Sequence, residues 1–140
     1  MNNLIIKRSQ IAEAQLTGSV SVGKKYAFTE IPNMSRNNIL LYGFEVYSRT
    51  QLAVTPLGNI PIVAAGVPHI TLSFRDVNKV EFVYQMPLYN LIRSNVSGFI
   101  TMITPRLINL TDSYVQVTAT ASLNVDEVVP VNLFYSFPNE

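Results

Sequence analysis

The chain lacks cysteine and tryptophan altogether, and His69 is its only histidine. Without cysteine it cannot form disulfides or thiolate metal sites, and one histidine cannot build a histidine metal cluster. A Ser-His-Asp triad needs three groups in contact, but no Gly-x-Ser-x-Gly elbow presents a nucleophile. Glycine-rich phosphate loops are missing too. We therefore predict that the protein is not an enzyme, that it has no cofactor, metal or small-molecule substrate, and that His69 is a structural or surface residue.

Closely spaced carboxylates are also scarce. Asp76 with Glu81 and Asp126 with Glu127 are the near pairs. Such pairs could support glycoside hydrolysis, and the second pair with Asp112 could offer oxygen ligands to Ca²⁺. Both pairs fall in or beside expected turns, and no EF-hand loop is present. We interpret them as solvated turn residues.

Charged residues make up only 14% of the chain, against about 25% in a typical soluble domain. Residues 50–74 contain no charged side chain if His69 is neutral. Three prolines interrupt this stretch, so it does not resemble a membrane-spanning helix of about 20 apolar residues. Because interfaces between subunits are depleted in charge, we predict that another subunit covers part of it. The residues expected in that interface are Leu52, Val54, Leu57, Ile60, Ile62, Val63 and Val67.

The two ends of the chain carry opposite charge. No Lys or Arg follows Arg106, and the basic residues near the start are Lys7, Arg8, Lys24 and Lys25. The net charge of +1 argues against strong binding of nucleic acid. We expect these four basic residues to make weak contacts with nucleic acid or electrostatic contacts with neighbouring subunits.

The first residues do not follow the order of a signal peptide. Three apolar residues, Leu4, Ile5 and Ile6, precede the basic pair, whereas a signal peptide has its positive charge before a longer apolar run. We therefore predict no signal peptide and no transmembrane segment, and assign these three residues to a subunit interface. They belong to an expected N-terminal arm over residues 1–18.

Apolar and polar residues alternate with period 2 in residues 39–49, 69–75, 80–85, 115–122 and 131–136. Strict alternation predicts strands with one face on a core. In residues 80–85 it places Val80, Phe82 and Tyr84 on one face. Weaker strands are expected at 19–28, 98–103 and 106–110, and short helices at 9–16 and 87–92. About eight strands separated by turns predict an all-β antiparallel sandwich or single jelly roll over residues 19–140.

The pattern of residues 70–92 indicates a strand, a turn, a second strand and then an apolar turn that begins with proline. The segments 105–117 and 130–136 each begin with a proline. In this style the chain resembles small capsid-shell proteins of tailless icosahedral viruses, closest to those of membrane-containing bacteriophages of the jelly-roll lineage. The likeness covers about residues 39 to 137, and no functional residue is carried over, because the family has no diagnostic motif. It implies a single-barrel vertex (penton) or minor shell protein, with a basic arm facing inward or lacing neighbours, and a location near an internal membrane.

We therefore predict a structural virion protein that forms part of an icosahedral capsid through repeated contacts with copies of itself and with other shell proteins. On this hypothesis Ile62→Asp blocks assembly and leaves the sandwich folded. The alternative is a carbohydrate- or receptor-binding sandwich of a fibre, tail or cell surface. It predicts exposed tyrosines clustered at one end, drawn from Tyr42, Tyr47, Tyr84, Tyr89 and Tyr114.

Overall fold

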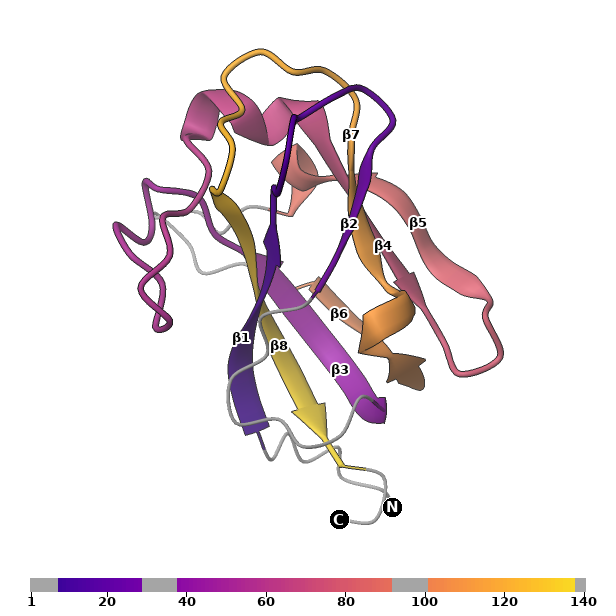
Figure 1. Ribbon diagram of the computed structural model, residues 1–140. Coiled ribbons are helices and arrows are strands. Elements are labelled where there is room, and N and C mark those ends of the chain that lie inside the picture. Colours follow the sequence, from indigo (N-terminus) through magenta and orange to yellow (C-terminus); the bar gives the residue numbers. More distant parts are fainter. Residues whose placement is uncertain (1–7, 29–37, 92–100, 138–140) are drawn as a thin grey trace.

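Two four-stranded sheets face each other in the computed structural model, which describes residues 8–28, 38–91 and 101–137 (Figure 1). The strands are β1 (Arg8–Gln15), β2 (Lys25–Ala27), β3 (Asn38–Val46), β4 (Ile70–Arg75), β5 (Glu81–Pro87), β6 (Thr101–Asn109), β7 (Tyr114–Val117) and β8 (Val128–Ser136). Three short 3₁₀ helices join them: η1 (Ala64–His69), η2 (Leu88–Asn90) and η3 (Leu110–Asp112).

The strand order is β1-β8-β3-β6 in the first sheet and β2-β7-β4-β5 in the second. All neighbouring strands are antiparallel. Each strand is therefore followed in the chain by a strand of the other sheet, with one exception. Strands β4 and β5 are consecutive and pair with each other as a hairpin. This order is that of a jelly roll, so the expected fold class is confirmed.

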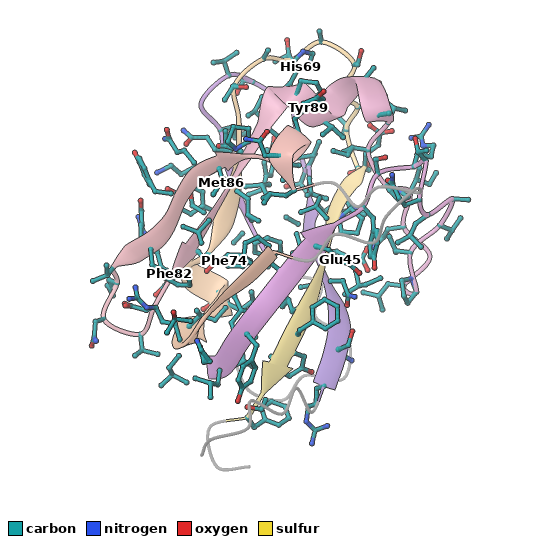
Figure 2. All side chains as sticks on the ribbon, turned by 180° about the vertical axis from the view of Figure 1, so that it is seen from behind. Glu45, His69, Phe74, Phe82, Met86 and Tyr89 are labelled. Carbon is teal, nitrogen blue, oxygen red and sulfur yellow. The ribbon has the colours of Figure 1, made fainter. Side chains whose placement is uncertain are left out.

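The core lies between the sheets and is built by the alternation that the sequence predicts. In β4, Ile70, Leu72 and Phe74 are fully buried, and in β8 the residues Val131 and Leu133 are as well. Phe74 lies at the centre of an aromatic cluster, with ring centroids 6.1 Å from Phe28, 4.9 Å from Phe44 and 6.4 Å from Phe82. Figure 2 labels Phe74 and Phe82 next to each other, and the half-buried Phe82 packs against the core from β5. Edge-to-face and offset ring pairs of this kind add to the stabilisation from burial.

The strict alternation predicted for β3 is wrong, because a β-bulge interrupts the strand. Its pairing with both neighbouring strands shifts between Leu41 and Gly43. The extra residue changes which positions face inward, so Ile39 and Leu41 lie in the core before the bulge, and Phe44 and Val46 after it. Odd-numbered residues therefore face the core before the bulge and even-numbered residues face it afterwards. A pattern with a fixed period of two does not predict this change.

Strand β5 also departs from the expected pattern. Val80 and Tyr84 are exposed, whereas Val83 is buried in the core. The pairing of β4 with β5 shifts at Phe74, and Gln85 has a positive φ of 49°. These irregularities lie on an edge strand, where bulges are common and hinder pairing with another chain.

Several expected elements need correction in extent or type. The helix expected at 9–16 is wrong, because residues 9–15 belong to strand β1, which pairs over its whole length with β8. Residues 8–15 of the expected N-terminal arm thus belong to the first sheet, and residues 1–7 lie outside the described residues. The two weak strands around Pro105 are one strand, β6, and the strand at 19–28 is limited to β2. The turn after Pro87 is present as η2.

Arg106, on β6 of the first sheet, connects that sheet to the β4–β5 hairpin of the second sheet. Its guanidinium lies 3.7 Å from the Asp76 carboxylate and 4.7 Å from the centre of the Phe82 ring. Asp76 Oδ1 also accepts hydrogen bonds from the backbone N–H groups of Asn78 and Val80, both at 2.9 Å. One largely buried carboxylate thus shapes the hairpin turn and holds it against the other sheet.

Candidate functional site

The uncharged segment begins with a loop, residues 50–63, which we call the apolar loop. It projects to one side of the sandwich, beside the ends of β1 and β8 where Gln15 and Val128 lie (Figure 1). Its last part is fixed by a parallel bridge from Pro61 to Val128, with hydrogen bonds Ile62 N–H to Val128 C=O and Val128 N–H to Ile60 C=O, both 3.0 Å. The loop is therefore attached to the first sheet by its backbone.

A buried carboxylate fixes the tip of the apolar loop. Glu13 of β1 is fully buried, and its Oε1 accepts hydrogen bonds from the Thr55 hydroxyl at 2.8 Å and the Asn59 amide at 3.1 Å. Thr55 and Asn59 also bond to each other through Thr55 N–H to Asn59 C=O, at 2.9 Å, and Asn59 N–H to Thr55 Oγ1, at 3.1 Å. Hydrogen bonds to a charged group are stronger than neutral ones, so Glu13 holds a closed turn over residues 55–59.

A second ionic anchor joins the apolar loop to the loop before β8. Arg49 pairs with Glu127, and its Nε donates to the Pro61 carbonyl at 3.2 Å. The other Glu127 oxygen accepts from the Asn124 backbone N–H at 3.1 Å. Because the Glu127 side chain is only 7% exposed, this pair is better shielded from water than a surface salt bridge. The two loops are thereby held in one arrangement.

Between these two loops lies an open groove of about 490 Å³, which we call the loop-end groove. Its lining combines an aliphatic part with amide and charged groups: Gln15, Arg49, Gly58, Asn59, Ile60, Val125, Asp126 and Glu127. The apolar loop and the loop before β8 expose aliphatic side chains in and near this groove. The exposed fractions are 54% for Val54, 42% for Leu57, 51% for Ile60 and 50% for Val125. We call these four residues the aliphatic patch.

The structure separates the seven interface residues expected in this region into three groups. Val54, Leu57 and Ile60 are exposed, whereas Leu52 and Val63 are half-buried. Ile62 and Val67 are buried in the core of the same chain, so an interface role is wrong for these two. The physical reason is the bridge to β8, which turns Ile62 inward between the sheets. Leu4, Ile5 and Ile6 lie outside the described residues.

The expected basic contacts lie mainly on and around β2. Lys24 Nζ donates to the backbone carbonyls of Thr17 and Ser19, at 3.0 and 3.2 Å, so it fixes its own loop. Lys25 is exposed, with Nζ 4.6 Å from the centre of the Tyr114 ring. Arg8 contacts the Phe137 ring at 4.7 Å, and Lys7 lies outside the described residues. Lys24 and Arg8 are therefore committed to contacts within the chain.

The outward face of the second sheet continues from Lys25 as a polar network. Tyr114 lies between Lys25 and Arg75, and its hydroxyl donates to Glu81 Oε1 at 3.3 Å. Glu81 also pairs with Arg75, and hydrogen bonding to this carboxylate raises the pKa of Arg75 above its ordinary value. Arg75, Glu81 and Tyr114 are thus bonded to one another, which favours a structural role for this face.

The clustered tyrosines expected by the carbohydrate-binding alternative are only partly exposed. Tyr42, Tyr47 and Tyr114 are buried, whereas Tyr84 on β5 and Tyr89 in η2 are exposed. Figure 2 shows Tyr89 at the same end of the molecule as His69. None of these tyrosines lines the loop-end groove. The ring platform that would stack a sugar is therefore reduced to two exposed side chains.

The interpretation of both carboxylate pairs as solvated is wrong for one member of each. Asp76 and Glu127 are buried and ion-paired, as described above. Within residues 8–28, 38–91 and 101–137, no three His, Cys, Asp or Glu side chains gather as a metal site would require. His69 Nδ1 lies 2.6 Å from the Ala121 carbonyl oxygen, a contact that ties η1 to the loop after β7.

A further polar cluster was missed by sequence reasoning and lies on the outward face of the first sheet. Glu45 of β3 is buried there and accepts from the Tyr47 hydroxyl and, at 3.2 Å, from the Asn132 amide of β8. Figure 2 shows Glu45 close to the strand end from which the apolar loop leaves. Glu13 was missed as well, and so were Gln15, Arg49 and Val125 of the groove lining, whereas Ile60 was expected at an interface. The sequence feature that could have indicated the groove is Val125, an isolated valine in a polar turn.

Among the described residues, no helix has the length and apolar character needed to cross a membrane. Comparison of the chain with protein-family models, curated proteins and solved structures finds no match.

Proposed function

We propose that this protein is a structural subunit of an icosahedral virion shell, which assembles through repeated contacts with copies of itself and with other shell proteins. Because one fold serves many functions, the strand order alone does not carry this proposal. The observation that carries it is the aliphatic patch, which projects into water from the uncharged apolar loop and the loop before β8, two loops that buried carboxylates hold in place.

The physical argument concerns the cost of this exposed surface. Four aliphatic side chains from two loops lie about half exposed, and covering the exposed half of each is worth about half of the roughly 1.5–3 kcal/mol gained by burying a whole Val, Leu or Ile side chain. Exposed apolar patches with a polar rim are typical of protein interaction sites. The anchors at Glu13 and Glu127 reduce the conformational freedom that the loops would lose on binding, which favours a firm contact.

The jelly-roll order and the single-domain size support a shell subunit with one barrel, which suits a vertex (penton) or minor shell position. The resemblance in strand and turn style supports the bacteriophage assignment. Contact with nucleic acid is weak in this proposal, because the described basic residues make contacts within the chain. Lys24 donates to backbone carbonyls, Arg8 contacts the Phe137 ring, and the exposed Lys25 contacts the Tyr114 ring.

The test is the native mass of the purified protein by light scattering at low and high salt, followed by negative-stain electron microscopy. A closed oligomer or a shell-like particle is expected. Monomers at high concentration that also fail to join the particles formed by the virus's other shell proteins would refute the proposal. Saturable binding of a glycan by such monomers would instead support the carbohydrate-binding alternative.

A further inference from the structure

The aliphatic patch and the loop-end groove form one surface whose chemistry restricts what can cover it. Ile60 and Val125 belong to both, so the patch and the groove share two apolar side chains. Two ionisable groups that face this groove remain partly in water, Arg49 and Asp126. The surface therefore has an aliphatic centre with one exposed cation and one exposed anion beside it.

The bonding of these two charged residues leaves each with capacity for a partner. Arg49 uses Nε for the Pro61 carbonyl and Nη2 for Glu127, and its side chain is still 41% exposed. Asp126 uses its backbone N–H for the Leu16 carbonyl, at 2.8 Å. Within the described part of the chain its carboxylate has no ion pair. A guanidinium presents five N–H donors, so Arg49 can donate to a second carboxylate while it stays paired with Glu127.

We infer that this surface is a two-fold contact between two copies of the chain, in which Arg49 of each copy pairs with Asp126 of the other around a shared centre of Ile60 and Val125. An isologous contact uses the same surface on both subunits and must complement itself. A surface with one cation and one anion beside an apolar centre meets that condition, because rotation by 180° brings opposite charges together.

Other occupants fit the same surface less well. A nucleic acid or an anionic membrane would meet two carboxylates, Asp126 and Glu127, against the single cation Arg49. A sugar would lack an aromatic platform, because no aromatic residue lines the groove. A different protein would need its own matching pair of charges, whereas a second copy supplies both by symmetry.

This inference rests on the proposed function, because it assigns to the self-assembling subunit one of its contacts. The two can nevertheless fail separately. A two-fold contact gives a dimer by itself, and larger particles need additional contacts elsewhere on the subunit.

The experiment is sedimentation equilibrium of the full chain over a wide range of concentration, comparing wild type with Ile60→Asp, Val125→Asp and Asp126→Asn. Val80→Asp is the matched control, since Val80 is 53% exposed but lies in the β4–β5 turn, on the other side of the molecule (Figure 1). Far-ultraviolet circular dichroism and thermal melting establish that each variant is folded. Asn at 126 tolerates the positive φ of 70° found there.

We expect Ile60→Asp and Val125→Asp each to raise the dissociation constant of the dimer by at least about 100-fold, because two apolar contacts are lost per dimer. Asp126→Asn removes two exposed ion pairs and should raise it by about 2- to 30-fold, with a weaker dependence on salt. Val80→Asp should leave it within about 2-fold of wild type, as expected for a substitution outside the contact.

A folded wild type that stays monomeric at high concentration would overturn the two-fold contact. So would dimers that Val80→Asp weakens as much as Ile60→Asp. If wild type forms large particles and Ile60→Asp forms them equally well, the proposed function stands and this contact is wrong. If wild type stops at a dimer that Ile60→Asp dissociates, and this dimer fails to join the particles formed by the other shell proteins, the contact stands and the shell function fails.

Discussion

Ile60 and Ile62 lie two residues apart at the end of the apolar loop and provide a sharp test of how this segment is divided. Ile60 is 51% exposed, whereas Ile62 is fully buried and belongs to the core. Truncating a buried Ile to Ala typically costs about 2–5 kcal/mol, from lost transfer free energy and the cavity left behind. The same truncation of a half-exposed side chain on a loop should change the free energy of unfolding by less than about 0.5 kcal/mol.

The assay is urea unfolding followed by tyrosine fluorescence or circular dichroism, at a concentration where the protein is monomeric. With an m-value of about 2 kcal/mol/M, a loss of roughly 3 kcal/mol in Ile62→Ala lowers the urea midpoint by about 1.5 M. Ile60→Ala should shift it by less than about 0.3 M. Ile62→Asp adds the burial of an unpaired carboxylate and should prevent folding, contrary to the expectation drawn from the sequence.

Equal midpoints for Ile60→Ala and Ile62→Ala would refute this division of the loop. A stable, folded Ile62→Asp that merely fails to assemble would restore the original interface role of Ile62.

Three other predictions concern the groups that hold the sandwich and its loops. Phe74→Ala should lower the free energy of unfolding by about 3–5 kcal/mol, because it opens the centre of the aromatic cluster; a loss below about 1 kcal/mol in urea unfolding would contradict that placement. Asp76→Ala should cost about 1–3 kcal/mol, since two turn N–H groups lose their acceptor, and Asp76→Asn should recover part of this; identical losses would show that the acceptor oxygen is unimportant. Glu13→Ala should speed amide hydrogen exchange at Thr55 and Gly58 by at least about 10-fold relative to core strands, as local opening requires; unchanged exchange there would show that Glu13 does not hold the loop tip.

The sequence alone predicts the fold class because the information is local and repeated. The period-2 alternation in β4 and β8 places Ile70, Leu72, Val131 and Leu133 on core faces without knowledge of any partner strand. Turn residues limit the strands, and a sandwich is the simplest way to bury eight half-apolar strands.

The alternation pattern predicts the wrong inward face where an extra residue shifts the pairing of a strand. The bulge in β3 and the irregular pairing of β5 depend on how a strand meets its neighbours, so the inward face of residues 39–46 could not be read from alternation alone. Residues 9–16 contain apolar spacing compatible with a helix, yet pairing with β8 makes them a strand. Tertiary pairing outweighs such weak local preference.

The sequence by itself determined that this is a β-sandwich with little charge and an uncharged, proline-rich segment in its middle. Only the tertiary structure decided which residues of that segment face water. The bridge from Pro61 to Val128 turns Ile62 into the core and leaves Ile60 outside. Likewise, Glu13 is 42 residues from Thr55 and Arg49 is 78 from Glu127 along the chain. No local pattern reports such pairs, because their contact exists only once the two sheets and their loops have been brought together.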